Sequence, residues 1–440
     1  MRRPRPGILE VEGVHWWLGP GFTPGEAGPA LARALEARAG GRARNLRTGR
    51  RKELYALALG SSGEPDHLLK VNLYRRRLRG SKARHELRTA VALAGRGVAT
   101  PLPVAAGERR RGGLLRACYL LVPLVPGAAD LAARWRGGVP APAERRALAC
   151  GFGALARRLH DAGLRQDDFA PNNFLVRPGD PPALLAIDFE RARLGRRPAS
   201  RRRRLAMLAK LERRVGTAAS ASDRLRFLHA YAGDAAGARL WWRRLEAAAP
   251  ARARRDLAHW LHRATRDGRR FTRVARPGWW GFARRDADLE ALAGAAQRVL
   301  ADAGGRGLRE VPGAWCVVQG ALRRRAAARL WARAQLLFDG RGLAPRPLAL
   351  LADGRATLLF LERDPAAAPG SWEEPAARCL RARLRAIGEL DAPLPAEALA
   401  LAPGPGGRVR ALLLDPSRWR PRGTRWPARG AARLPQAAAQ

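Results

Sequence analysis

The chain has 440 residues, of which 47% are apolar, and this length and composition predict two or three domains with sizeable cores. Only four of its 83 basic residues are lysines, the other 79 are arginines, and the formal net charge is +45. Genomic base composition can explain the choice of arginine over lysine but not the net charge, because that exchange is charge-neutral. The excess predicts an anionic environment: a phosphorylated substrate, an acidic membrane surface or nucleic acid.

The composition and hydropathy exclude a membrane-spanning or secreted protein. No uninterrupted apolar run approaches the roughly 18 residues of a membrane helix, and the basic start of the chain lacks the apolar core of a signal peptide. The four cysteines, at 118, 150, 316 and 379, lie far apart without metal-ligand spacing. We therefore expect reduced thiols in a cytoplasmic protein that can bind the inner face of the cytoplasmic membrane through its arginines.

The first third of the chain predicts a small antiparallel sheet with one helix, followed by a hinge between two lobes. Short apolar segments alternate with turns that contain glycine or proline, which is the pattern of paired strands. In chain order the predicted segments are a strand–turn–strand at residues 42–59, the strand His67–Leu73, the helix Ser81–Ala94, further strands that include Cys118–Val122, and the hinge at residues 122–127.

The middle of the chain predicts a long helix, Glu144–Ala162, that leads into a polar loop. In this loop Asp168 and Asn173 stand five residues apart, and the apolar strand Ala183–Ile187 then ends at Asp188 of a D-F pair. This is the spacing of a kinase catalytic loop, D-x-x-x-x-N, and of its metal-binding aspartate. The order of the predicted elements is that of an α+β, bilobal protein-kinase-like fold.

Phosphoryl transfer explains these residue types. It needs a carboxylate beside the attacking hydroxyl, which suits Asp168, and oxygen ligands for Mg²⁺, which Asp188 and the amide of Asn173 can supply. Asparagine is scarce in this chain, with four in all, yet two of them are adjacent in this loop. The alternative, that these are ordinary turn residues, is the weaker interpretation because the spacing occurs together with the D-F pair and an upstream lysine.

Three residues of the first third are candidates for binding ATP. Lys70 lies inside an apolar strand, where a lysine is unusual unless its ammonium reaches a partner or extends to solvent. In a kinase fold it would contact the α/β-phosphates, and Glu86 on the next helix would be its ion-pair partner. The alternative for Glu86 is a solvated helix charge. Gly49 is the only glycine in the turn that would cover the phosphates, and no G-x-G-x-x-G motif occurs.

Several residues typical of protein kinases are absent. Gln166 and Asp167 stand where a histidine and an arginine usually precede the catalytic aspartate, and Glu190 replaces the glycine of D-F-G. No A-P-E motif follows, and a basic helix is predicted from Arg201 instead. These differences argue against a protein kinase and for a small-molecule or glycolipid kinase.

The sequence from about residue 40 to residue 235 resembles the bacterial lipopolysaccharide kinase family. The resemblance is carried by L-H-D-A-G-L at residues 159–164, D-F-A-P-N-N-F-L-V at residues 168–176 and I-D-F-E-R-A-R-L at residues 187–194. Members of this family phosphorylate Kdo or heptose in the lipopolysaccharide inner core, so the resemblance implies a transferase with an alcohol group as acceptor.

The resemblance also implies roles for individual residues. Asp168 would be the catalytic base, Asn173 and Asp188 would bind Mg²⁺, and Lys70 would bind ATP. Gln166 departs from the histidine common in the family, which concerns the geometry of the loop more than its chemistry. Arg191 and the nearby Arg193 either contact an anionic acceptor or belong to a solvated basic segment.

The C-terminal half resembles a second, eroded copy of the first. Residues 340–350 resemble residues 95–105, and an apolar strand ends in Asp415 as the earlier strand ends in Asp188. The expected catalytic loop lacks D-x-x-x-x-N, and the strand Trp315–Val318 lacks a lysine. We interpret the chain as a tandem of one active and one degenerate kinase-like copy; the alternative is a chance match of sequence rich in Ala, Arg and Leu.

The second copy would serve in docking or substrate positioning. Its aromatic and basic cluster at residues 269–285 either lies on an anionic membrane surface or contributes buried core tryptophans. The predicted domains are an N-terminal extension (1–40), a kinase N-lobe (41–126), a kinase C-lobe (127–250), a degenerate kinase-like repeat (251–420) and a disordered basic tail (421–440).

The function expected from the sequence is an ATP- and Mg²⁺-dependent kinase for an anionic, lipopolysaccharide-like glycolipid at the cytoplasmic membrane face, with no specific nucleic acid as partner. Two alternatives remain. An aminoglycoside or small-metabolite phosphotransferase would favour an acidic pocket, and the charge of +45 speaks against it. A non-catalytic basic scaffold that binds nucleic acid or membrane is the other, since the charge alone would suffice for it.

Overall fold

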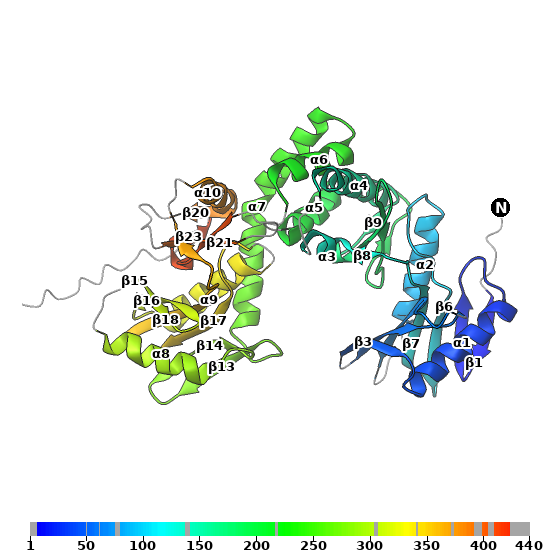
Figure 1. The fold of residues 1–440 in the computed structure, drawn as a ribbon, viewed down its shortest axis with the longest axis horizontal. Coiled ribbons are helices and arrows are strands. Elements are labelled where there is room, and N and C mark those ends of the chain that lie inside the picture. Colours follow the sequence, from blue (N-terminus) through cyan, green and yellow to red (C-terminus); the bar gives the residue numbers. More distant parts are fainter. Residues whose placement is uncertain are drawn as a thin grey trace, which may run out of the picture. The chain divides into compact units, whose positions relative to one another are not determined.

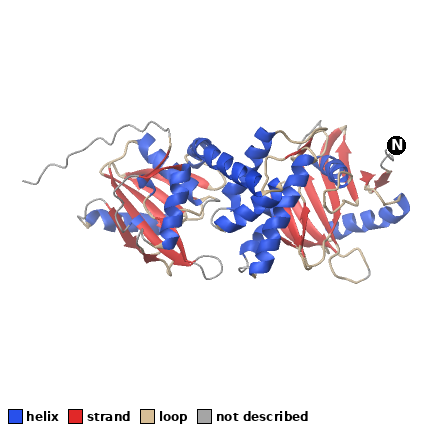
Figure 2. Ribbon diagram, turned by 90° about the horizontal axis from the view of Figure 1, so that it is seen from above, coloured by secondary structure: helices blue, strands red, loops and turns tan. Residues whose placement is uncertain are grey.

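The computed structural model describes residues 7–49, 51–60, 62–74, 80–136, 141–215, 219–302, 307–339, 342–370, 374–390, 398–403 and 409–422. Helices and strands are mixed in it, as the α+β prediction requires (Figure 2). The chain divides into two compact units, Met1–Leu245 and Glu246–Gln440. All of the predicted tail beyond residue 422 lies outside the described residues. None of the described helices combines the length and apolar character needed to cross a membrane.

Unit 1 begins with a seven-stranded antiparallel sheet of strand order β1-β2-β6-β7-β5-β4-β3 (Figure 1). Residues 7–39 of the predicted N-terminal extension form two of these strands and a helix, so this segment is part of the sheet domain. The strands are β1 (Ile8–Val11), β2 (Val14–Leu18), β3 (Arg44–Gly49), β4 (Lys52–Leu57), β5 (His67–Leu73), β6 (Ala105–Arg111) and β7 (Leu114–Pro123).

Two helices pack on the opposite faces of this sheet. The helix α1 (Pro24–Ala39) begins with a capping box between Thr23 and Glu26 and packs on the face that contains Leu69. The helix α2 (Lys82–Ala94) packs on the other face and begins at the cap of Ser81. The buried residues of α2 are Ala83, Glu86, Leu87, Thr89, Ala90 and Leu93. All but Thr89 have the spacing of one helix face.

The rest of unit 1 is mainly helical, with short strand pairs beside the helices. Its three-stranded sheet has the order β11-β10-β8, and β12 pairs with β9. The elements are β8 (Ala129–Asp130), α3 (Leu131–Arg136), α4 (Pro142–Asp161), β9 (Leu164–Arg165), the 3-10 turn η1 (Pro171–Asn173), β10 (Phe174–Arg177), β11 (Ala183–Ala186), β12 (Arg193–Leu194), α5 (Arg201–Val215) and α6 (Ala221–Ala232). The next helix, α7 (Ala235–Ala264), begins in unit 1 and continues past Leu245 into unit 2.

The packing of α4 against α6 buries a histidine. The ring of His160 is fully buried and its Nδ1 shares a hydrogen bond of 2.8 Å with the hydroxyl of Tyr231. Burial, helped by the charge of Arg204, lowers the pKa of His160 to about 3. The folded state therefore holds this imidazole neutral at every pH at which the chain is expected to work.

We expect the free energy of unfolding of unit 1 to fall as the pH drops below about 6.5. The reason is that His160 is protonated below this pH in the unfolded chain, but only below about pH 3 in the folded chain. The slope approaches about 1.4 kcal/mol per pH unit. Denaturant titrations at pH 7, 6 and 5 measure it. The His160→Gln variant should be less stable than the wild type, but its free energy of unfolding should depend less on pH over this range. The exposed His229→Gln is the matched control and should keep the wild-type slope; equal slopes for all three proteins would contradict the assignment.

Unit 2 contains a six-stranded antiparallel sheet of order β13-β14-β17-β18-β16-β15 and two smaller sheets, β19-β21-β22 and β20-β23. Its elements are β13 (Phe271–Arg276), β14 (Trp279–Arg284), α8 (Leu289–Ala301), β15 (Gly307–Val311), β16 (Ala314–Gly320), α9 (Arg324–Phe338), β17 (Pro347–Ala352), β18 (Ala356–Glu362), β19 (Ala368–Pro369), α10 (Pro375–Ile387), β20 (Gly388–Leu390), β21 (Leu399–Pro403), β22 (Val409–Leu413), the 3-10 turn η4 (Pro416–Arg418) and β23 (Trp419–Pro421).

The core of unit 2 collects the tryptophans of the C-terminal half. Trp260, Trp315, Trp331 and Trp419 are all buried in one cluster, and the indole of Trp331 donates to the carbonyl of Ala264 over 2.9 Å. Within the aromatic cluster at residues 269–285, Phe271 is buried and Trp279 and Trp280 are partly buried. That cluster therefore contributes to the packing of unit 2 as well as to its surface.

The two large sheets share one strand order. The series β1-β2-β6-β7-β5-β4 in unit 1 and the series β13-β14-β17-β18-β16-β15 in unit 2 have the same connectivity. The helices agree too: α1 follows β2 as α8 follows β14, and α2 follows β5 as α9 follows β16. The small sheets agree as well: β8-β10-β11 matches β19-β21-β22, and the pair β9-β12 matches β20-β23. Among the described elements, β3, α3 and the helices α5 and α6 have no counterpart in this correspondence.

Candidate functional site

The polar residues of the predicted catalytic loop are each anchored by a phenylalanine that follows them. Asp168, Asn173 and Asp188 precede Phe169, Phe174 and Phe189, and all three rings are at most 2% exposed. The rings of Phe169 and Phe174 meet edge to face with centroids 5.4 Å apart. Because each ring is fixed in the core below α4, the adjacent polar side chain is held at the surface of that core.

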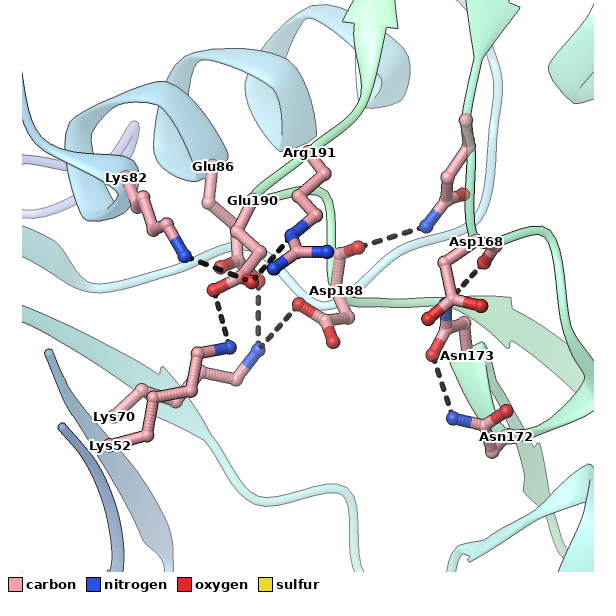
Figure 3. A network of polar contacts seen from close by, with 11 residues as sticks. Lys52, Lys70, Lys82, Glu86, Asp168, Asn172, Asn173, Asp188, Glu190 and Arg191 are labelled. Carbon is pink, nitrogen blue, oxygen red and sulfur yellow. Dashed lines mark hydrogen bonds and ion pairs between the residues drawn. The ribbon is translucent and has the colours of Figure 1, made fainter. Parts of the chain in front are cut away.

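Lys70 and Glu86 form the ion pair that the sequence predicts. The Nζ atom of Lys70 on β5 lies 2.8 Å from Oε1 of Glu86 on α2 and 3.9 Å from Oδ1 of Asp188 (Figure 3). Burial by itself lowers the pKa of Lys70, but the carboxylates of Glu86 and Asp188 outweigh it and hold that pKa above its usual value. The side chain is therefore an ammonium at neutral pH, beside the end of the strand that carries Asp188.

Asn173 is buried and is oriented by its own loop. Its Nδ2 donates to the carbonyl of Asp168 over 2.7 Å, and its carbonyl accepts from the backbone N–H of Ile187 over 2.9 Å. These bonds join the catalytic loop to the end of β11. Since the amide nitrogen is used in this way, the amide oxygen is the end left to face a ligand. That oxygen accepts from Nδ2 of Asn172 over 3.1 Å, and its second lone pair stays available.

Asp188 has an unusual backbone conformation that another side chain supports. Its φ angle is 62°, in the left-handed region that residues other than glycine rarely adopt. The Nε2 atom of Gln166 donates to the carbonyl of Asp188 over 3.0 Å. Gln166 is itself buried, and its backbone N–H is 3.4 Å from the sulfur of Met207. The glutamine therefore anchors the loop after β11, which answers the question of loop geometry that this substitution raised.

Asp168 projects from the loop with its side chain 56% exposed. The nearest cationic partner among the described residues is Arg214 on α5, whose Nη2 lies 3.7 Å from Oδ1 of Asp168. The neighbouring Asp167 is almost fully exposed and points elsewhere, because Lys210 donates to its carbonyl over 3.0 Å and to its carboxylate over 3.1 Å. Asp168 is thus the accessible carboxylate next to the Asn173 anchor, as its predicted role requires.

The hairpin of β3 and β4 carries the remaining predicted residue. Gly49 is the last residue of β3 and pairs with Lys52, the first residue of β4.

The two arginines that follow Asp188 are both exposed. Arg191 is 71% exposed and lies 3.6 Å from a carboxylate oxygen of Glu190. Arg193 is exposed in β12 and pairs with Arg165. The structure thus groups Lys70, Glu86 and Asp188 directly, and Asp168 with Asn173, while Gly49 stands at the tip of the hairpin.

The sequence alone did not single out three further residues of the site. Lys52 and Lys82 both contact Glu190, the residue that replaces the glycine of D-F-G, at 2.7 Å and 3.3 Å. A signal for the two lysines was present, because lysine is as scarce as asparagine in this chain, with four of each. That argument was applied to Lys70 alone, whereas all four lysines lie on acidic residues of the site or its loop.

The oxygen atoms present suit a hard cation that shares its shell with phosphates. Among the described residues there is no group of three or more His, Cys, Asp or Glu side chains placed to hold a metal by themselves. Magnesium in phosphotransferases is held by one or two protein oxygens, with phosphates and water completing the shell. The carboxylate of Asp188 and the oriented amide oxygen of Asn173 form such a partial donor set.

Comparisons with known proteins find one family for the part of the chain that contains this site. Residues 33–231 match the family model described as the lipopolysaccharide kinase (Kdo/WaaP) family. Among solved structures, one titled "WaaP in complex with acyl carrier protein" is similar, with 24% identity, a TM-score of 0.39, and coverage of 52% of this chain and 98% of that chain. A search of the curated proteins finds no match. The family match spans every residue of the site from Gly49 to Asp188.

Proposed function

We propose that unit 1, whose residues 33–231 match the lipopolysaccharide kinase (Kdo/WaaP) family, is a phosphotransferase that uses ATP and Mg²⁺ to phosphorylate a sugar hydroxyl of an inner-core-like glycolipid. The observation that carries the proposal is the meeting of Lys70, Glu86 and Asp188 within 3.9 Å. These residues come from β5, α2 and the end of β11, and they carry the charges that a nucleoside triphosphate requires.

In this proposal Asp168 orients the acceptor hydroxyl and accepts its proton. Its exposure leaves room for a hydroxyl at hydrogen-bond distance. Arg214, at 3.7 Å, is far enough to leave the carboxylate oxygens available to a hydroxyl. The bond from Asn173 to the carbonyl of Asp168 keeps the loop in one conformation, so the carboxylate is positioned before the acceptor arrives.

Lys70 would hold the α- and β-phosphates. Its ammonium has three donors, of which one is used by Glu86. The ion pair fixes the direction of the ammonium and leaves donors for phosphate oxygens. Asp188 and Asn173 would hold Mg²⁺, which when bound neutralises charge on the transferred phosphoryl group. The bond from Gln166 to the carbonyl of Asp188 keeps the aspartate at the end of β11.

The charge of the chain supports an anionic acceptor and an acidic membrane surface as partners. The formal charge is +45, and exposed arginines surround the loop after Asp188, at positions 191, 193, 196, 197, 201, 202 and 203. Clustered arginines attract anionic lipids and phosphorylated sugars. We therefore place the acceptor at the cytoplasmic face of the membrane, where arginine contacts add to the binding of the sugar.

Unit 2 is proposed to be a kinase-like copy without phosphoryl-transfer chemistry. The common strand order supports a repeat, and so does a shared hydrogen bond: Leu414 donates to Ala398 over 2.8 Å as Ile187 donates to Asn173. By this correspondence Asp415 matches Asp188 and Ala398 matches Asn173. All four lysines of the chain lie in unit 1, so no counterpart of Lys70 exists. A docking or substrate-positioning role remains for this unit.

We expect the full chain to turn over ATP in a Mg²⁺-dependent manner, and to do so faster when a lipopolysaccharide core or Kdo–lipid A is added as acceptor. The physical reason is that productive transfer needs a positioned sugar hydroxyl beside Asp168. Release of ADP is measured with and without acceptor, and the product is checked for phosphate by mass spectrometry.

Other acceptors, tested in the same assay, distinguish the glycolipid kinase from the two alternative functions. An aminoglycoside or a free sugar that stimulates turnover better than any glycolipid would favour a small-metabolite phosphotransferase on the same fold. Absence of turnover with every acceptor, together with tight binding to polyanions that weakens steeply with salt, would contradict the kinase proposal and favour a basic scaffold.

A further inference from the structure

The lysines of this chain are distributed in a way that composition does not explain. Lysine occupies only four of 83 basic positions. Three of these contact carboxylates of the site: Lys52 and Lys82 contact Glu190, and Lys70 contacts Glu86. The fourth, Lys210, contacts the catalytic loop. Arginine is used nearly everywhere else in the chain. Lysine, whose ammonium is a compact point charge suited to phosphate, is found at the site and its loop.

Lys52 and Lys82 meet on one carboxylate, that of Glu190. Nζ of Lys52 is 2.7 Å from its Oε2, and Nζ of Lys82 is 3.3 Å from its Oε1 (Figure 3). The three residues come from three elements: the tip of the β3–β4 hairpin, the first turn of α2 and the loop two residues after Asp188. This bridge, Lys52–Glu190–Lys82, ties the tip of the hairpin and the start of α2 to the loop that follows Asp188.

The bridge is not neutral. Glu190 offers one negative charge to Lys52 and Lys82, and Arg191 adds a third cation at 3.6 Å. Lys70 faces two carboxylates, those of Glu86 and Asp188. Taken together, four cations meet three carboxylates, so one net positive charge remains beside Asp188.

The stability of α2 does not account for Lys82. A cation in the first turn of a helix opposes the helix dipole, and α2 has no acidic residue in that turn. Each lysine ammonium carries three donors, and one bond to Glu190 leaves two for oxygen atoms of a ligand. Lys52 is half exposed and Lys82 a quarter exposed, whereas Glu190 is only 10% exposed. The carboxylate is thus the buried member of the bridge, and the two lysines are its more exposed members.

We propose that Lys52 and Lys82 bind phosphate oxygens of the nucleotide, and that Glu190 is a positioning residue that holds both ammonium groups at the phosphate site. This inference rests on the proposed use of ATP and deepens it. It assigns the missing phosphate-covering function to a lysine at the hairpin tip, where a glycine-rich motif is absent, and it gives a role to the residue in place of the D-F-G glycine.

The test measures binding of Mg·ADP and Mg·ATP to the full chain by calorimetry, without any acceptor. We expect Lys52→Ala and Lys82→Ala each to weaken binding about 10-fold or more, the size of a charge-assisted hydrogen bond. Arg51→Ala is the matched control, because it removes the same charge from an exposed position beside Lys52. It should change affinity by less than about 2-fold, since exposed charges are screened. Lys52→Arg should restore part of the loss.

Glu190→Gln separates positioning from competition by the sign of its effect. If Glu190 merely competed with phosphates for the lysines, removing its charge would tighten nucleotide binding. If it positions them, binding should weaken about 5-fold, because two released lysine side chains must be ordered again by the ligand. Tighter or unchanged binding of this variant would overturn the positioning role.

The outcome also separates this inference from the proposed function. If the Lys52 and Lys82 variants bind Mg-nucleotide as tightly as the wild type, the inference is overturned and the kinase assignment is left intact. A wild-type chain that binds no Mg-nucleotide would overturn the use of ATP and the inference with it. Thermal unfolding of every variant checks that it is folded, and Lys52→Gln replaces Lys52→Ala where the latter is not.

Discussion

Asp168→Asn should reduce phosphoryl transfer by about 1000-fold while leaving nucleotide binding close to wild type. General-base catalysis contributes about 100- to 10,000-fold, and the asparagine keeps the size of the side chain but cannot accept the proton of the acceptor hydroxyl. The bond from Asn173 goes to the backbone carbonyl of residue 168, so the loop should keep its conformation in this variant. Initial rates at saturating ATP and acceptor, with Mg·ADP affinity measured separately, give the two quantities.

Asp167→Asn is the matched control for this substitution. It makes the same chemical change one residue earlier, on a carboxylate that is 96% exposed and contacts Lys210 rather than the site. Its rate should stay within about 3-fold of wild type, since an exposed ion pair contributes little. Equal losses in the two variants would indicate a general effect of loop charge. A fully active Asp168→Asn would contradict the assignment of the base.

Most of the first unit could be predicted from the sequence because its signals are local. The apolar strand around Lys70, the helix carrying Glu86 and the strand before Asp188 each have the period of the element they form, and the structure confirms all three. The pairing of Lys70 with Glu86 was predicted from the resemblance to kinases, and the 2.8 Å contact agrees with it.

The details that position the site depend on tertiary structure and were beyond sequence patterns. The role of Gln166 depends on where the carbonyl of Asp188 points, which the left-handed φ of that residue determines. The contact of Lys52 with Glu190 joins residues 138 positions apart, and no periodicity indicates such a pair. The lysine count was the available signal, and it identifies residue types rather than partners.

The common strand order of the two units shows a different limit. The sequence match between the halves is short and lies in Ala/Arg/Leu-rich segments, so composition alone can produce it. Strand order instead reflects which strands bury which faces, and this depends on the alternation of apolar positions rather than on residue identity. The resemblance therefore extends further in topology than in sequence, starting at β1 and β13, before the segments whose sequences match.

Asp188→Asn should lower the rate at least about 100-fold at low Mg²⁺ and shift the Mg²⁺ dependence to higher concentration. Magnesium prefers carboxylate oxygen, and the loss of several kcal/mol of charge stabilisation corresponds to a factor of this size. The asparagine keeps the main-chain carbonyl that accepts from Gln166, so the local fold should persist. Rates measured over a series of free Mg²⁺ concentrations, with chelator as the zero point, give the shift.

Asp415→Asn is the control that the second unit provides. Asp415 ends β22 as Asp188 ends β11, but its carboxylate is used locally, accepting from the N–H of Ser417 over 2.9 Å and pairing with Arg418 at 3.2 Å. The substitution keeps the cap, because an amide oxygen can accept the same bond from Ser417, but it removes the ion pair with Arg418. It should therefore cost at most about 1 kcal/mol of stability and leave the Mg²⁺ dependence unchanged. A shift in both variants would mean that unit 2 also binds the metal, because a carboxylate that serves only as a local cap holds no metal ion.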